Sequence, residues 1–186
     1  FNNHLYKDIL DKEEKLRKDV RKYPELKEYR KGGNRQKNKL PVWVAFSYFE
    51  LGTVTMMYNY LRGDLRKAIL VYSFAKTTYA KRDTEVMDTW LDAVRNLRNY
   101  CAHNSMLVGM TSSVVLMDSN DDATLLQADN DLFSRIYALK KLIPIDDTDN
   151  MKKDIKKLIN KTPVDVCLLG ILPSNWEEIY DKIVEF

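Results

Sequence analysis

The side chains best suited to chemistry lie together between residues 92 and 103. On an ideal helix, at about 100° per residue, four polar residues of this segment fall along one line. Histidine titrates near neutral pH and moves protons, and neighbouring amides add hydrogen-bonding groups. The spacing therefore predicts a candidate catalytic edge at a helix end, formed by Asp92, Asn96, Asn99 and His103.

Two arginines of the same segment lie on other sides of that helix. Arg98 falls about 140° from His103 on the ideal wheel, and Arg95 lies between them as a candidate phosphate contact. Either Arg98 curls back toward His103, or the histidine it meets belongs to a second copy of the helix. A structural interpretation is also open: Arg98 covers apolar surface with its stem, and His103 interacts with the last helical carbonyls. The apolar stripe beside Arg98 is formed by Trp90, Val94, Leu97 and Cys101.

Apolar residues recur at helical spacing through most of the 186 residues, which predicts an all-α helical bundle in a single domain. We expect an N-terminal helix and basic loop over 1–39, then core helices with the candidate edge over 40–103. Residues 104–130 are rich in Ser, Thr, Asn and Asp and predict a long irregular insertion with room for a short strand pair. C-terminal helices follow over 131–186.

Within this plan, residues 5–23 form an amphipathic helix, and Pro24 starts another short helical turn that Gly32-Gly33 ends. We expect one long helix over 40–61, apolar on most sides and central to the bundle, and a later helix over 83–103 that carries the edge. The helix between them begins at Gly63, and its predicted buried face comprises Leu65, Ala68, Ile69, Tyr72, Ala75 and Tyr79.

Tryptophans and caps complete the structural expectations. Trp43, Trp90 and Trp176 lie on apolar faces, which favours core packing over base stacking. Residues 132–143 and 151–159 have helical spacing. The last helix has a capping signature from Ser174 to Glu177, in which each side chain would satisfy a free backbone amide.

The net charge does not indicate a nucleic-acid partner, because 30 basic residues nearly balance 27 acidic ones and leave a charge of only +3. Any RNA-binding surface must therefore be local. The run from Arg30 to Lys39 has five basic residues and no acid, so Arg35 and Lys37 are candidate phosphate contacts. A solvated loop is the alternative interpretation.

The cysteines and the apolar run over residues 40–61 indicate the cellular compartment in which the protein works. The two cysteines, Cys101 and Cys167, have apolar sequence neighbours and form no disulfide framework, which favours a reducing cytoplasm. Residues 40–61 contain Glu50 and Asn59, so a buried helix is favoured over a membrane span, and no membrane partner is expected. Because the chain starts at Phe1, we expect that it begins inside a longer protein or follows a processing step.

Residues 97–105 resemble the Arg-Asn-x-x-x-His signature of HEPN ribonucleases, in the form seen in the Abi (AbiD/AbiF-like) abortive-infection family. Residues 40–43 followed by 51–54 are similar to that family's Trp-containing helix leading into a Gly-Ser/Thr step. Residues 169–176 resemble its Gly-x-x-Pro-x-x-Trp ending. The three matches keep family order over roughly residues 40–180.

The chain also departs from the family pattern. Ser47 stands where members often have an acid, and Met106 and Gly109 stand where Arg and Asn are usual after the histidine. These substitutions put substrate contact near the site in doubt. Family members also usually extend further at the N-terminus.

The resemblance implies a HEPN-like bundle that cuts RNA without a metal or cofactor, through attack by the RNA 2′-hydroxyl. It makes His103 the general base or acid and Arg98 the group that stabilises phosphoryl charge. Asn99 would orient the imidazole or bond a phosphate oxygen. We expect further RNA contacts from Arg95, Asn96 and Asn104. A compact cluster of metal-ligating side chains is not evident around the motif, which agrees with this chemistry.

The expected partners are RNA, a second copy paired through the motif helices, and an antitoxin or regulatory RNA. Two other interpretations stay open. One is a catalytically weak HEPN module that binds RNA or protein without cutting. The other is a toxin held inactive by a partner, which shares the chemistry and differs in control.

Overall fold

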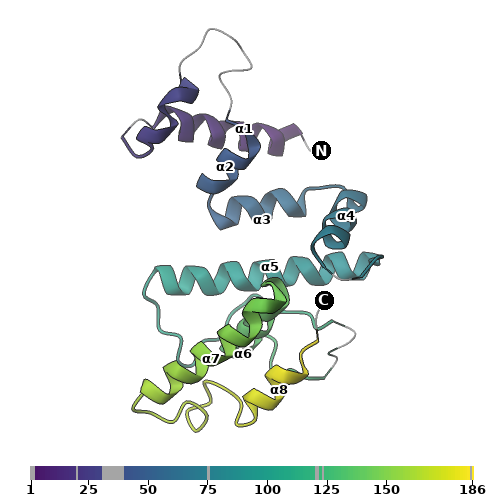
Figure 1. Ribbon diagram of the computed structural model, residues 1–186, viewed down its shortest axis with the longest axis vertical. Helices are drawn as coiled ribbons and strands as arrows, with labels where there is room; N and C mark the ends of the chain where they lie inside the picture. The colour runs from purple at the N-terminus through teal and green to yellow at the C-terminus, as the bar shows by residue number, and fades with distance from the viewer. Residues whose placement is uncertain are drawn as a thin grey trace. The chain divides into compact units, whose positions relative to one another are not determined.

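The computed structural model describes residues 3–19, 21–30, 40–74, 76–119, 122, 124–184 and 186. These residues form eight α-helices and one 3-10 helix, and none of them lies in a β-strand. The all-α prediction is therefore confirmed. The chain divides into two compact units, Phe1–Arg62 and Gly63–Phe186 (Figure 1). The expectation of one domain over 1–186 stays a prediction.

The first unit contains α1 (Asn3–Lys18), the 3-10 helix η1 (Pro24–Arg30), α2 (Val42–Tyr48) and α3 (Leu51–Asn59). The helical turn that begins at Pro24 was predicted, whereas its predicted end at Gly32-Gly33 lies outside the described residues. Two polar contacts join α1 to later segments of the unit. Lys12 donates to Thr53 Oγ1 at 2.8 Å, and Glu13 Oε1 accepts from the Leu40 amide at 2.7 Å.

The prediction of one helix over 40–61 is wrong. Phe49 and Glu50 have extended backbone angles, φ −70°, ψ 139° and φ −62°, ψ 146°, which separate α2 from α3. Neither residue is Gly or Pro, so the break has no local signal. At the break, Tyr48 and Phe49 pack against a buried cluster of Leu26, Leu40 and Ala45.

Trp43 was expected in the core and is 75% exposed, so that prediction is also wrong. Ala45 of the same helix is buried, and Val44 packs on the cluster described above. The short helix thus turns its small residue inward and its largest one outward. The helices α2 and α3 belong to the unit Phe1–Arg62, and the expectation that residues 40–61 form the centre of one bundle stays a prediction.

The second unit is built around α5 (Lys81–Ala102), which packs against α6 (Leu132–Leu142). Trp90 of α5 is completely buried and makes edge contacts with Tyr137 and Phe186, with ring centroids 6.0 and 4.6 Å apart. The Asp83 carboxylate accepts from the Ala80 amide at 2.6 Å and so satisfies a free donor at the start of α5. The predicted motif helix over 83–103 is confirmed to within two residues.

The helix α4 (Gly63–Ser73) begins at Gly63 as predicted, but the part of the predicted buried face that lies within it is wrong. Tyr79, beyond the end of α4, is buried as predicted, and Ala75 lies outside the described residues. Tyr72 is 93% exposed, and Leu65 and Ile69 are exposed as well, whereas Leu70 is fully buried. Arg66 explains the orientation, because its guanidinium pairs with Asp88 of α5 and donates to the Thr84 carbonyl at 2.6 Å. Hydropathy alone would place Arg66 on the exposed side of α4. Its contacts with α5 instead set the rotation of α4.

The helices α7 (Ile145–Lys161) and α8 (Trp176–Lys182) complete the unit. The predicted capping box at Ser174 is wrong: Asn175 is the N-cap and makes no side-chain cap bond. The Trp176 amide donates to the Pro173 carbonyl at 3.0 Å, so the chain turns before the helix begins. A buried apolar cluster joins these helices to α6 and is formed by Phe133, Val166, Leu172, Trp176, Ile179 and Tyr180.

The segment between α5 and α6 was predicted to be irregular, and its described residues contain neither an α-helix nor a strand. In place of the strand pair, two backbone bonds cross it, from Ser112 N to Asn130 O at 3.0 Å and from Leu116 N to Asp129 O at 2.9 Å. The Trp90 indole also donates to the Met117 carbonyl at 2.9 Å. The long insertion is therefore fastened to α5.

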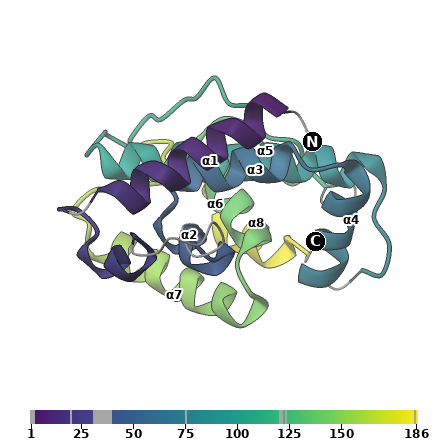
Figure 2. The same ribbon diagram turned by 90° about the horizontal axis from the view of Figure 1, so that it is seen from above.

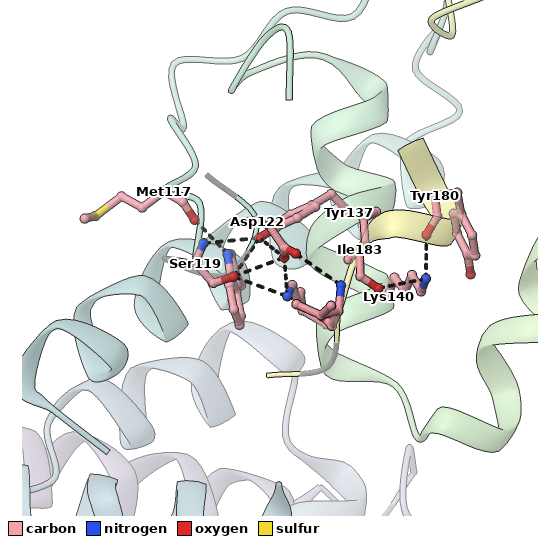
Figure 3. A network of polar contacts seen from close by, with 10 residues as sticks. Met117, Ser119, Asp122, Tyr137, Lys140, Tyr180 and Ile183 are labelled. Atoms are coloured by element: carbon pink, nitrogen blue, oxygen red, sulfur yellow. Dashed lines mark hydrogen bonds and ion pairs between the residues drawn. The ribbon is translucent and has the colours of Figure 1, made fainter. Parts of the chain in front are cut away.

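A buried polar network fastens the same insertion to α6 (Figure 3). The Asp122 carboxylate pairs with Lys141, and both side chains are 0% exposed. That carboxylate also accepts from the Tyr137 hydroxyl at 2.9 Å, the Ser119 hydroxyl at 3.0 Å and the Val184 amide at 3.1 Å. A buried charge is tolerated when it is paired and fully hydrogen-bonded, and this one is.

Candidate functional site

The candidate site lies at the C-terminal end of α5, where the backbone forms a Schellman motif. The Ser105 amide donates to the Tyr100 carbonyl at 2.9 Å, and the Asn104 amide donates to the Cys101 carbonyl at 3.3 Å. Asn104 has φ 51°, in the left-handed region that Gly and Asn tolerate best. His103 is the C-cap, so this turn fixes the backbone position from which its imidazole extends.

The structure leaves the three predicted catalytic residues open to solvent: Arg98, Asn99 and His103 are all exposed. Arg98 Nη1 donates to Asn99 Oδ1 at 3.4 Å, a long and weak contact. No hydrogen bond or ion pair within the described part of the chain joins Arg98 to His103. One copy of α5 therefore brings Arg98 to Asn99 and does not bring the guanidinium to the imidazole.

The predicted RNA contacts differ in availability. Arg95 is half-exposed and pairs with Asp92, one turn earlier, at 3.0 Å. Such an exposed pair is weak, so a phosphate can compete for the guanidinium. Asn96 is half-buried, and its Oδ1 is buried and has no hydrogen-bond partner among the described residues. Arg35 and Lys37 lie outside the described residues.

Three apolar side chains close to His103 in the sequence are exposed, and we call them the apolar rim: Cys101, Met106 and Val108. Cys101 was expected in apolar surroundings and is exposed instead, while Met106 is 75% exposed. Exposed apolar side chains at the edge of a site favour contact with another molecule. Sequence reasoning noted Met106 only as a departure from a pattern and missed this rim.

Sequence reasoning also missed Arg135 of α6, which is 0% exposed and holds the insertion that follows the site. Its guanidinium donates to the Asp129 carbonyl at 3.1 Å and also to the Val114 carbonyl. Burial lowers the pKa of Arg135, and the nearby Asp131 opposes that effect. The available signal was its spacing, because Arg135 lies three residues before Ala138, on the buried face of α6.

A cavity of about 780 Å³ lies elsewhere in the second unit. It lies among the ends of α4, α6 and α7 and the C-terminal segment, and no residue of the candidate site lines it. Its lysines are already engaged: Lys140 donates to the Tyr180 and Ile183 carbonyls at 2.5 and 3.1 Å (Figure 3), and Lys141 pairs with Asp122. This cavity therefore offers no free cation to an anionic ligand.

The described residues contain no group of three or more His, Cys, Asp or Glu side chains placed to hold a metal ion. No helix among them is long and apolar enough to cross a bilayer.

A family model described as Abi-like protein matches residues 1–108, which is more than half of the chain. The chain belongs to the Abi-like protein family. The match ends five residues after His103, so all of the candidate site lies within the part that this Abi-like chain shares with its family. Most of the insertion and the helices α6 to α8, including the Trp176 segment, lie outside it. No curated protein and no solved structure matches the chain.

Proposed function

We propose that this Abi-like protein is a metal-independent endoribonuclease of the HEPN type that acts in abortive infection. The observation that carries the proposal is the capped end of α5, where Arg98, Asn99 and His103 are exposed within the family-matched segment. Abortive-infection function is what the family suggests. The chemistry is proposed from these three side chains.

The proposed reaction needs no group beyond the RNA and the protein. The 2′-hydroxyl gives its proton to His103, and the 2′-oxygen forms a bond to the adjacent phosphorus. The bond from that phosphorus to the 5′-oxygen of the next nucleotide breaks, and the leaving oxygen takes a proton from a general acid. The products are a 2′,3′-cyclic phosphate and a free 5′-hydroxyl. Proton transfer by a positioned histidine contributes about 10²–10⁴-fold in rate.

Arg98 would stabilise the negative charge that develops on the phosphoryl oxygens, and Asn99 would orient the imidazole or bind one of those oxygens. Both residues are exposed, and water weakens such electrostatic effects. A productive site therefore needs RNA or a second protein copy to exclude water from this end of α5.

The proposal includes a homodimer through the motif helices. Two observations support it: Arg98 and His103 are not joined within one copy, and the apolar rim of Cys101, Met106 and Val108 is uncovered. In a dimer, a guanidinium and an imidazole from different copies would meet at one phosphate. We expect light scattering at working concentrations to give the mass of two chains, and a monomer alone would contradict this part.

The test is cleavage of a 5′-labelled single-stranded RNA in EDTA by the wild type and by His103→Ala and Arg98→Ala. We expect both variants to lose at least a hundredfold in rate. The matched control is His4→Ala, because the chain has only two histidines. Equal cutting by the His103 variant would refute the mechanism. Binding of RNA by gel shift without cutting by the wild type would favour the non-catalytic RNA-binding module.

A further inference from the structure

The helix α7 carries two rows of lysines with different surroundings. The inner row faces α8, where Lys152 pairs with Asp181 at 2.6 Å and Lys156 pairs with Glu177 at 2.8 Å. These pairs hold α7 to α8, so the fold accounts for the inner row.

The outer row consists of Lys153, Lys157 and Lys161, all exposed. No ion pair recorded for the described residues involves any of them. Like charges four residues apart destabilise a helix, and this row contains two such neighbouring pairs. Lys161 gains from the helix dipole in the last turn, but that effect fades within one turn. No ion pair among the described residues therefore accounts for the outer row.

The outer row is a compact cationic track. Residues four apart on a helix are separated by about 6 Å along its axis, so the three ammonium groups spread over about 12 Å. Asp154 is the one acid between residues 153 and 161. The acids Asp146 and Asp147 lie in the first turn of α7, where the helix dipole favours them.

The place of this track in the second unit connects it to the candidate site. The C-terminal ends of α5 and α7 lie at the same end of that unit, at the left in both views (Figures 1 and 2). A polyanion bound at the end of α5 that continued over this end of the unit would run toward the last turns of α7.

We propose that the outer row of α7 binds the phosphates of single-stranded RNA, as an anchoring site separate from the candidate catalytic end of α5. This inference rests on the proposed ribonuclease function, and it extends the RNA-binding surface into a part of the chain that the family match does not cover. Lysines act here as point charges on the backbone, so the site would not select a sequence.

The experiment measures how salt affects binding of a fluorescent 20-nucleotide single strand whose 2′-oxygens are methylated, which prevents cleavage. Each phosphate contact on a single strand contributes about 0.7 to the slope of log affinity against log salt. Lys153→Gln/Lys157→Gln should therefore lower the slope by about 1.4 and the affinity at 0.1 M salt by about 25-fold, and the two proteins should converge toward 1 M. Lys153→Arg/Lys157→Arg should keep the wild-type slope.

The matched control is Lys81→Gln/Arg82→Gln, which removes the same charge at the opposite end of α5, where Lys81 is 88% exposed. Its slope should stay at the wild-type value. An unchanged slope in the α7 variant, or an equal loss in the control, would overturn the anchoring site while RNA cleavage still supports the proposed function. Failure of the wild type to bind the strand at all would overturn both. Melting temperatures within error of the wild type confirm that the variants are folded.

Discussion

Asn104 offers the sharpest test of how the fold holds the candidate site. It is predicted to contact RNA, and the structure also gives its backbone a role, because its φ of 51° closes the turn that follows His103. Two substitutions separate these roles. Asn104→Gly removes the side chain and tolerates the left-handed backbone, whereas Asn104→Ala removes the side chain and resists that backbone.

The magnitude follows from two competing costs. An alanine held in the left-handed region costs roughly 1–2 kcal/mol. Opening the turn sacrifices two backbone hydrogen bonds, at 2.9 and 3.3 Å, each with a net value of about 0.5–1.5 kcal/mol. Because these costs are similar, Asn104→Ala should leave the last turn of α5 open in a sizeable fraction of molecules. A loss of about 1 kcal/mol lowers the melting temperature by about 2–4 °C in a chain of 186 residues.

The assay measures amide exchange at Ser105, melting temperature and RNA cleavage in the wild type and in both variants. We expect Asn104→Gly to keep the protection of the Ser105 amide and Asn104→Ala to lose it. Cleavage that survives in the glycine variant and falls in the alanine variant assigns Asn104 a backbone role. Cleavage lost equally in both assigns its amide side chain to the RNA. Identical protection and melting in both variants would refute the reasoning about the turn.

The remaining predictions concern the buried groups of the second unit. Lys141→Met should lower the free energy of unfolding by about 3–5 kcal/mol, because it leaves the Asp122 carboxylate buried without its cation. Adding Asp122→Asn should recover part of that loss in urea unfolding, and an additive double variant would contradict the pairing. Burial raises the pKa of Tyr180 to about 12, above the ordinary value near 10, so the folded state favours the protonated phenol. The stability from this phenol is present below pH 10 and is lost as the pH rises toward 12. Tyr180→Phe should flatten that alkaline decline, at the cost of the hydrogen bond to the Thr148 carbonyl, and an unchanged decline would count against it.

The motif helix was the part of the fold most open to prediction. Its ends came within two residues, because the apolar stripe through Trp90 has strong 3.6-residue periodicity. On the ideal helical wheel Asn99 and His103 lie on the polar side and Arg98 lies beside the apolar stripe. The exposure of all three residues agrees with these positions. Their role in chemistry is not visible in spacing and rests on the resemblance.

The errors arose where tertiary contacts overrode local pattern. The rotation of α4 depends on the Arg66 guanidinium, which reaches Asp88 of α5, and no periodicity reports such a contact. The break at Phe49 and Glu50 lacks a breaker residue. The buried positions of Arg135 and Lys141 depend on carbonyls and carboxylates of the insertion, which become partners only once the chain has folded.

The most direct test of the central claim is the chemistry of the cut ends. We expect mass spectrometry of RNA incubated with the protein in EDTA to show 2′,3′-cyclic phosphate and 5′-hydroxyl termini. We also expect no cut where a single 2′-deoxynucleotide replaces the nucleotide that carries the attacking hydroxyl, and no products from His103→Ala. Cutting that persists at the deoxynucleotide, or that leaves 5′-phosphate ends, would contradict the account, because neither result can arise from 2′-hydroxyl attack assisted by His103.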